Sequence, residues 1–353
     1  MSRETLNWLN NNVLVGFTEK RGTAWHYKKS EQGEESNHYP GAIPVEDVIR
    51  RLFDWEPVES EIYIRIPPQL TPSGVTTERY VKVRDRKCII RSDYLTNAGA
   101  EINAMGTFSE GYAPHPYREW LVNNIANILD GDLGIGSAGL LRDGARAWVQ
   151  VEVPDNIVTP EGVAFRPHIL AYTSFDGSLA TTYRRSSTVV VCDNTLEIAR
   201  RENGPKYTVK HTKGSALKIS NAREALNIIY QSADDFTAQV ARLCRTEVSD
   251  KAWRMFLSAY VPYPENRNKR GMSIADRKRG ELNRLYMWDD RAAPWQGTAY
   301  GVIAAVNTFN HHYSAVRKGT SRADANMNKI IKGQMAADDR EALDLLDKVL
   351  TAV

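Results

Sequence analysis

Residues 135–153 read IGSAGLLRDGARAWVQVEV and predict a β-hairpin. The dipeptide Asp143-Gly144 suits the positive φ angles of a tight turn, so the segments on either side of it are expected to pair. In the second of these strands, small and aliphatic residues alternate with Trp148, Gln150 and Glu152. Because successive side chains of a strand point to opposite faces, this alternation predicts one face in the core and one face in water.

The following residues continue this pattern as an antiparallel meander. Residues 165–174 and 179–192 are predicted as two further strands, joined by a turn at Asp176-Gly177. Asn194-Thr195-Leu196-Glu197 then has the N-cap and the N3 acid of a capping box, which predicts a helix that begins at Asn194 and runs to about Arg201.

Regular structure is also predicted on both sides of the meander. Short helices follow Pro44 and Pro116, and short strands lie between them at residues 62–66, 80–83 and 88–90, the last two as a hairpin. Apolar residues with 3.6-residue spacing predict later helices at 222–246, 250–260, 275–288, 298–316 and 336–351.

The predicted fold class is therefore α+β: an antiparallel β-meander followed by a helix, with a mainly helical C-terminal half. We expect an α+β domain over residues 1–203 and a basic, mainly helical region over residues 204–353, which is either separate or continuous with the first. In the last helix Leu343, Leu346 and Val349 share one stripe, which is expected to pack on its own chain or on another copy in a homo-oligomer.

Composition narrows the class of protein. The chain has 353 residues, of which 42% are hydrophobic and 25% charged, and these values are typical of a folded globular protein. No stretch has the roughly 18 apolar residues of a membrane span, and the first residues lack the apolar core of a secretion signal, so a cytoplasmic protein of a host cell is expected. The three cysteines are isolated in sequence, which argues against a disulfide framework and a cysteine zinc site.

Charge is distributed unevenly along the chain. The formal net charge is +3, but residues 31–61 hold nine acids against two arginines, a balance of −7. Residues 200–223 hold seven basic residues against Glu202, a balance of +6. Such a run is either a solvated face or a surface that follows a phosphate backbone.

The basic run and its tyrosines lead to the main functional hypothesis, the binding of single-stranded nucleic acid. Cations neutralise phosphates, and aromatic rings stack on unpaired bases. The predicted nucleic-acid-binding residues are Trp148, Tyr172, Tyr183, Arg184, Arg185, Arg200, Arg201, Lys206, Tyr207, Lys210, His211, Lys213 and Lys218. The free amides at the start of the helix near Asn194 offer a further phosphate contact.

Two other functions stay open: a protein-interaction module that acts on a host factor, and a metal-dependent nucleic-acid enzyme. For the enzyme, His168, Asp176, Cys192, Asp193 and His211 are the residues that a sheet edge could bring together. Their spacing matches no catalytic or metal-ligand motif, so no catalytic residue, metal or cofactor is assigned, and binding without a chemical step is favoured.

Glycines before the hairpin resemble a dinucleotide fingerprint in letters alone. Residues 134–139 read GIGSAG, but they follow a predicted helix and enter a predicted strand, whereas the fingerprint follows a strand and opens a helix. No dinucleotide site is therefore predicted.

Several blocks of the sequence resemble a known family. They are Trp25-His26, residues 140–148, residues 173–178, residues 191–196 and His211-Thr212. In this order they are similar to the phage/plasmid-like protein family, domain of unknown function 932, with Phe175 and Asp193 as departures. The resemblance implies carriage by phages or plasmids and no established activity. The meander followed by a helix and a basic extension also resembles the core of phage single-strand annealing proteins of the Erf and Redβ type.

Overall fold

The computed structural model confirms the α+β fold class. It describes residues 4–96, 102–123, 133–152, 157–166, 168–186, 189–202, 206–215, 234–318, 322, 325–326, 329 and 334–352. The chain forms two compact units, one of residues 1–156 and 166–233 and one of residues 157–165 and 234–353. Because residues 157–165 belong to the second unit, the two units are not separated at a single position of the sequence.

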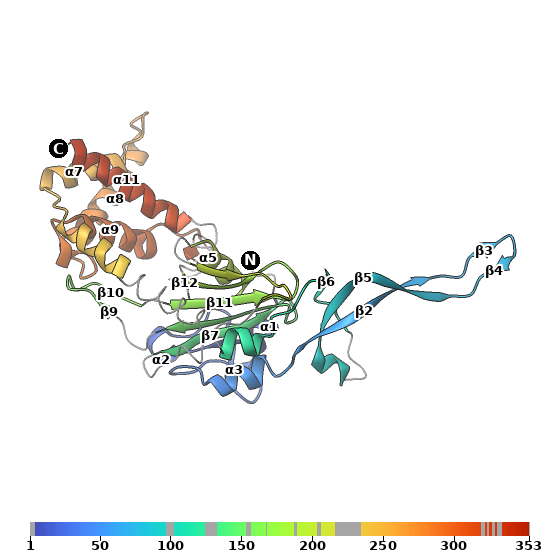
Figure 1. The fold of residues 1–353 in the computed structure, drawn as a ribbon. Coiled ribbons are helices and arrows are strands. Elements are labelled where there is room, and N and C mark those ends of the chain that lie inside the picture. The colour runs from blue at the N-terminus through green and yellow to red at the C-terminus, as the bar shows by residue number, and fades with distance from the viewer. Residues whose placement is uncertain are drawn as a thin grey trace. The chain divides into compact units, whose positions relative to one another are not determined.

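A six-stranded antiparallel sheet forms the centre of the first unit (Figure 1). Its spatial order is β1-β7-β8-β11-β12-β13, so the four strands of the predicted meander are consecutive neighbours. The strands are β1 (Val13–Val15), β7 (Gly134–Leu141), β8 (Arg146–Glu152), β11 (His168–Ser174), β12 (Thr181–Ser186) and β13 (Lys206–Val209).

The turn between β7 and β8 has the predicted backbone. Arg142, Asp143 and Gly144 have φ angles of 53°, 55° and 88°, all in the left-handed region. The strand predicted at 179–192 is shorter in the structure, because β12 ends at Ser186 and residues 189–192 are not in a strand.

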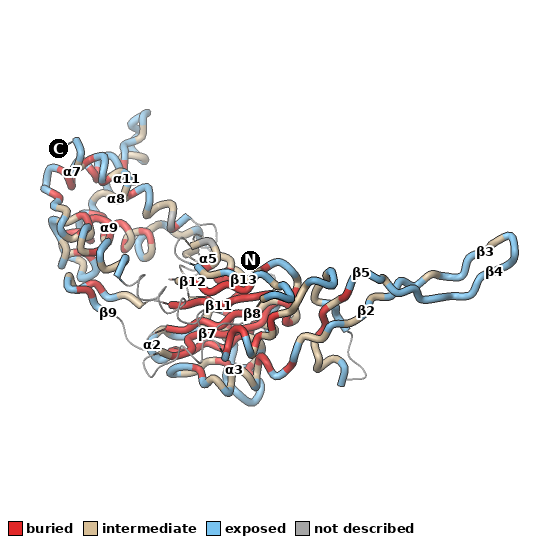
Figure 2. Tube along the Cα trace, in the orientation of Figure 1, coloured by how far each residue is buried: buried red, intermediate tan, exposed pale blue. Residues whose placement is uncertain are grey.

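Both faces of this sheet are covered, so the predicted wet face is wrong (Figure 2). On one face, Val149 and Val151 pack with α3 (Val45–Leu52) and with the π-helical turn η3 (Arg118–Asn123). On the other face, Trp148 and Tyr172 pack with residues of α1 (Leu6–Asn12) and α5 (Asp193–Arg201). The rest of the helix predicted after Pro116 lies outside the described residues.

The helix after the meander begins earlier than predicted. Its N-cap is Cys192, and the reciprocal capping partner is Thr195, whose hydroxyl oxygen accepts a hydrogen bond from the Cys192 backbone N–H at 3.0 Å. Cys192 is buried, as a small apolar residue at this junction would be.

A second sheet of the first unit forms a long two-stranded ribbon with a third strand at its base (Figure 1). The strands β2 (Pro57–Ile66) and β5 (Arg79–Arg91) pair along their length, and β6 (Gly106–Ser109) pairs with residues 86–89. The hairpin predicted between residues 80–83 and 88–90 is wrong, because both segments belong to β5. The short strands β3 (Leu70–Thr71) and β4 (Gly74–Val75) lie at the far end, where Leu70 is 85% exposed. We call residues 57–91 the ribbon.

Shorter helices complete the described part of the first unit. They are α2 (Thr18–Arg21), η1 (Lys29–Glu31) and η2 (Ser92–Leu95).

The second unit is helical, as predicted for the C-terminal half. Its apolar core gathers Trp253, Phe256, Leu282, Val302 and Leu346. The stripe of the last helix packs on α7 and α9 of its own chain. The elements are β9 (Ile157–Val158), β10 (Ala164–Phe165), helical residues 234–245, α7 (Asp250–Tyr260), α8 (Lys269–Trp288), η4 (Ala293–Trp295), α9 (Ala299–Thr308), η5 (Phe309–Tyr313) and α11 (Gln334–Ala352). Across the residues that the structure describes, no helix has the length and apolarity needed to cross a membrane.

Candidate nucleic-acid interface

Three of the aromatic residues predicted to stack on bases lie in the core. Trp148 is fully buried and its indole N–H donates to Ser137 Oγ at 3.0 Å. Tyr183 is 2% exposed, and its hydroxyl donates to the backbone carbonyl of Trp120. Tyr172 is 6% exposed. None of these rings presents a face to solvent, so their predicted exposure is wrong.

Two of the predicted cations serve the fold. Arg184 is 2% exposed and donates to the backbone carbonyls of Arg200 and Glu202 at the end of α5, where carbonyls lack helical partners. Arg200 pairs with Glu197 at 2.6 Å and lies over the ring of Tyr172. A phosphate would have to displace these contacts to reach either guanidinium.

Exposed lysines remain at the edge strand of the sheet. Lys206 lies on β13 opposite Arg184, and Lys210 and Lys213 follow on the next turn, all three exposed. Arg185 is half-buried on β12, and Tyr207 is half-buried against the apolar core. The side chain of Arg201 and all of Lys218 lie outside the described residues.

The predicted contact His211 belongs to a column of stacked rings. The successive ring centroids of Phe108, Tyr112, His211, His115 and Trp120 lie 3.7, 5.2, 4.1 and 3.6 Å apart. Phe108 lies on β6, at the base of the ribbon, so this column ties the ribbon to the segment after β13.

The two histidines of the column are held by threonine hydroxyls. Thr173 Oγ1 lies 3.0 Å from His211 Nε2, and Thr181 Oγ1 lies 2.7 Å from His115 Nδ1. Burial lowers the pKa of both rings, to about 4 for His211 and to about 3 for His115. His211 is therefore neutral near pH 7 and contributes no positive charge to a phosphate site.

The residues considered for an enzyme do not gather into one site. His168 begins β11 and Asp176 follows its end, so they are separated by the length of a strand, on the order of 20 Å. His168 lies 3.6 Å from the buried Glu152, which pairs with Arg21, whereas Asp176 pairs with Arg146 at 3.0 Å. Within the described ranges, no group of three His, Cys, Asp or Glu residues is arranged to hold a metal ion.

The ribbon has a face of tyrosines and cations that the sequence analysis missed. Tyr63 lies opposite Lys82 and Arg65 lies opposite Tyr80, so the four side chains share one face. Tyr63 is 53% exposed and Tyr80 63%. We call these four residues the tyrosine face. The sequence contains Tyr-x-Arg in one strand and Tyr-x-Lys in the next. That these residues share one face follows only from the register of the two strands.

Two acids fix the side chains of this face. Glu61 accepts a hydrogen bond from the Tyr63 hydroxyl at 2.6 Å and pairs with Lys82, whose hydrogen bond lowers the pKa of Glu61. Glu78 pairs with Arg65 at 2.7 Å and accepts from the Tyr80 hydroxyl at 3.1 Å. The tyrosine rings are thus oriented by their hydroxyl ends, and their ring faces stay open to solvent.

The opposite face of the ribbon is aliphatic. Ile64 lies opposite Val81, and the two are 57% and 42% exposed. Ile62, Ile66 and Val83 are half-buried residues of the same face by their alternation along the strands. We call these five residues the aliphatic face.

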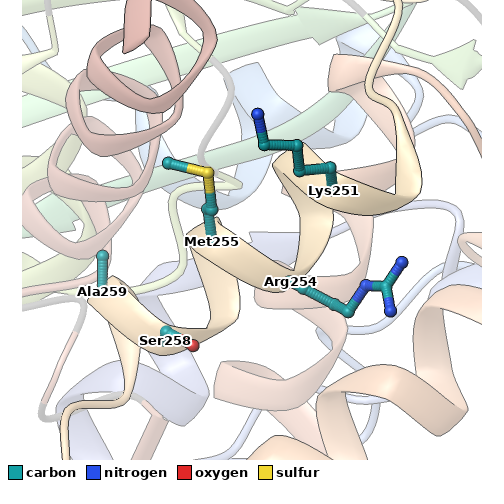
Figure 3. A pocket seen from close by; sticks show the side chains of 5 residues that line it. All are labelled: Lys251, Arg254, Met255, Ser258 and Ala259. Carbon is teal, nitrogen blue, oxygen red and sulfur yellow. The ribbon is translucent and has the colours of Figure 1, made fainter. Parts of the chain in front are cut away.

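An open hollow lies on α7 in the second unit (Figure 3). It has a volume of about 550 Å³ and is lined by Lys251, Arg254, Met255, Ser258 and Ala259. Figure 3 shows the two cationic side chains projecting from α7 in different directions. A single anion is therefore not bracketed by them.

Comparison with known proteins gives a family and no function. A family model described as "Domain of unknown function (DUF932)" matches residues 104–331, which is more than half of the chain. The match includes β7 to β13 and most of the second unit, and it begins after the ribbon. Neither the curated proteins nor the solved structures gave a match. The chain, with its doubly covered meander and helical second unit, belongs to the DUF932 family.

Proposed function

We propose that this chain binds single-stranded nucleic acid through the tyrosine face of the ribbon. The observation that carries the proposal is the presence of two exposed tyrosine rings beside Arg65 and Lys82 on one face of a two-stranded ribbon. We infer that the process served is annealing, or an accessory step of recombination or replication, because the meander with its basic extension resembles phage single-strand annealing proteins. The family resemblance adds only carriage by a phage or plasmid.

Stacking favours an unpaired strand over a duplex. Each base that stacks on an aromatic side chain contributes about 1–3 kcal/mol, and only an unpaired base can turn its ring face toward a protein side chain. Because Glu61 and Glu78 already orient Tyr63 and Tyr80, little rotational entropy is lost when bases stack on the rings.

The charge of the ribbon suits a phosphate backbone. Residues 57–91 hold seven cations against four acids, a balance of +3. Arg79 and Arg84 are exposed. Binding through such cations releases counterions, so the affinity is expected to fall as salt rises.

The test is a titration of labelled oligothymidine at low salt, followed by fluorescence anisotropy. Replacing Tyr63 and Tyr80 together by Ala is expected to weaken binding by at least tenfold, since about 1–3 kcal/mol is lost per stacked base. The matched control, Tyr63→Phe with Tyr80→Phe, keeps the ring faces and is expected to bind within about threefold of the natural chain.

A second variant distinguishes the ribbon from the edge of the six-stranded sheet. Changing Lys206, Lys210 and Lys213 together to Ala removes the exposed lysines among the nucleic-acid-binding residues that the sequence predicts. If this triple variant loses binding while the double Ala variant of the tyrosines keeps it, the interface lies at β13. No binding by the natural chain at low salt contradicts the proposal altogether.

A protein-interaction role has one observation in its favour, the exposed aliphatic face. Exposed apolar area that is continuous along an element is typical of a surface that another protein covers.

A further inference from the structure

Among the residues that the structure describes, the strand β2 lies at an unpaired edge of its sheet. In the order β2-β5-β6 it pairs with β5 alone, so one side of its ten residues has backbone N–H and C=O groups without a neighbouring strand in that sheet. Long exposed edges of this kind are templates for pairing with another strand. Natural proteins commonly block such edges with proline or a bulge. The prolines here lie outside the middle of β2, at Pro57 and Pro67. The register of β2 against β5 shifts between Glu61 and Tyr63, but the additional residues, 83–86, belong to β5, so β2 itself has no extra residue there.

The ribbon also lacks the packing that an isolated hairpin needs. Two strands alone are marginally stable in water, whereas three or more strands with an apolar face are stable. Ile64 and Val81 stay largely exposed in the single chain. A further pair of strands beside β2 would widen the aliphatic face, and the neighbouring side chains would cover part of the apolar area that Ile64 exposes to solvent.

We propose that two copies of this chain pair antiparallel through β2, about a two-fold axis at Tyr63. In this register each Glu61 lies opposite the second copy's Arg65, each Ile62 lies opposite the second copy's Ile64, and the two Tyr63 residues face each other. The pairs nearest the axis are therefore complementary: acid with base, aliphatic with aliphatic, aromatic with aromatic. Farther out, Ser60 lies opposite the second copy's Ile66.

Neighbouring registers are less complementary. With the axis at Ile64, Ile62 meets Ile66, but Arg65 meets Tyr63 and no acid lies opposite it. With the axis at Ile62, Glu59 meets Arg65, but Ile64 lies opposite Ser60. Of the three axes, the one at Tyr63 places both Ile62 and Ile64 opposite isoleucines and also places Glu61 opposite Arg65.

Charge complementarity extends across all four strands of the paired ribbons. Lys82 already pairs with Glu61, and Arg65 already pairs with Glu78. Pairing about Tyr63 places these two ion pairs side by side. In one row across the four strands, the order is then Lys82 and Glu61 of one copy, followed by Arg65 and Glu78 of the other. The signs then alternate along the row. A second copy of this chain supplies the matching sequence, and this singles it out as the partner.

Pairing through β2 joins the two tyrosine faces into one surface. The dimer itself does not rest on nucleic-acid binding, because it is measured on the protein alone. If oligothymidine binding fails and the dimer persists, only the proposed function is lost.

The first test measures mass in solution by light scattering and sedimentation. The natural chain is expected at twice its monomer mass, with dissociation on dilution. Glu61→Arg alone and Arg65→Glu alone each place like charges opposite each other across the axis, so each is expected to be monomeric where the natural chain is dimeric. A natural chain that is monomeric throughout overturns the proposal.

Mixing the two variants shows whether they are monomeric because the interface has like charges or because the ribbon is no longer folded. In a mixed pair, the two substituted residues meet as an ion pair on one side of the axis, and on the other side the natural Arg65 of E61R meets the natural Glu61 of R65E. E61R still lacks its own pair with Lys82, and R65E still lacks its own pair with Glu78. A heterodimer between differently tagged E61R and R65E chains is therefore expected. If each variant stays dimeric alone, or if the mixture stays monomeric, the register is wrong.

Oxidative cross-linking tests the axis directly. Residues directly opposite each other have Cβ atoms about 4.5–5.5 Å apart, within reach of a disulfide after small adjustments. Y63C is expected to form a covalent dimer on mild oxidation. Y80C is the matched control: Tyr80 is also exposed, but it lies on β5, one strand away from the axis. Y80C is expected to cross-link no more than the natural chain, which has three cysteines of its own. Equal cross-linking of both variants contradicts the axis.

Discussion

The six-stranded sheet and the ribbon have the same kind of sequence and opposite surroundings. In β8, Trp148, Gln150 and Glu152 alternate with aliphatic residues and are all buried. In β2, Tyr63 and Arg65 alternate with isoleucines and are both exposed. Alternation therefore assigns residues to the two faces of a strand, and it does not say whether either face meets water.

The difference between the two sheets comes from what covers them. Gln150 is satisfied by the Val190 N–H at 3.0 Å and by His168, and Glu152 is satisfied by Arg21. These partners bring polar groups into the core without leaving them unpaired. On the ribbon, Glu61 and Glu78 pair with neighbours on the same surface, so their side chains remain in solvent.

The largest difference in stability between the two sheets is expected when the largest buried ring is removed. Trp148→Ala is expected to lower the free energy of unfolding of the first unit by about 3–5 kcal/mol, because a fully buried ring is lost and a cavity is left. Chemical denaturation measures the change. Tyr80→Ala on the ribbon is the control and is expected to cost less than about 0.5 kcal/mol. Equal costs would mean that Trp148 is not covered as described.

A smaller effect is expected from filling the space that Trp148 occupies. A Cβ added at Gly139, directly opposite Trp148, would overlap the indole ring. Gly139→Ala is therefore expected to cost about 1–3 kcal/mol of unfolding free energy through overpacking. Gly111→Ala has open space around its added Cβ and serves as the control. A neutral Gly139→Ala would contradict the close packing of β7 on β8.

The pH dependence of stability also reflects the burial of the six-stranded sheet, because His168 on β11 is buried. Burial lowers the pKa of His168 from 6.5 to about 4, an effect that Glu152 opposes. The unfolded chain thus binds a proton on His168 that the folded chain does not, and stability is lost as pH falls from 6.5 to about 4. His168→Gln is expected to reduce the slope of unfolding free energy against pH by up to about 1.4 kcal/mol per pH unit. An unchanged slope in denaturation series over this range would show that His168 is solvated.

The smallest effect is expected on the ribbon. Lys82 pairs with Glu61 in solvent, and exposed ion pairs contribute about 0–1 kcal/mol. Lys82→Ala is expected to leave the free energy of unfolding unchanged within the error of the same denaturation experiment, because an ion pair in solvent contributes little to stability. A loss as large as that of Gly139→Ala would mean that the ribbon is covered in the single chain.

Local patterns were enough to predict the meander. Asp143-Gly144 predicts the hairpin turn, and the alternation from residue 145 predicts β8, because turns and strand faces depend on residues close in sequence. The ribbon was predicted only in part. Its strand β5 reads as two short segments around residues 84–87, where charged residues interrupt the apolar pattern.

Long-range partners could not be predicted from these patterns. Arg21 reaches Glu152 over 131 positions of sequence, and Trp8 donates to the carbonyl of Leu140 over 132. A basic run has the same sequence whether its arginines meet water or a helix end, so Arg184 was predicted as a phosphate contact although it binds the end of α5. The column of rings was missed for the same reason, since its fifth member comes about 90 residues after the others.

The column also sets an order for the assembly of the first unit. Phe108, Tyr112, His115 and Trp120 are translated long before His211, which occupies the middle of the stack. A nascent chain that still lacks residue 211 leaves Tyr112 and His115 without the ring between them and Thr173 without its imidazole partner. Closure of this part of the unit therefore has to wait until the ribosome has delivered the segment after β13.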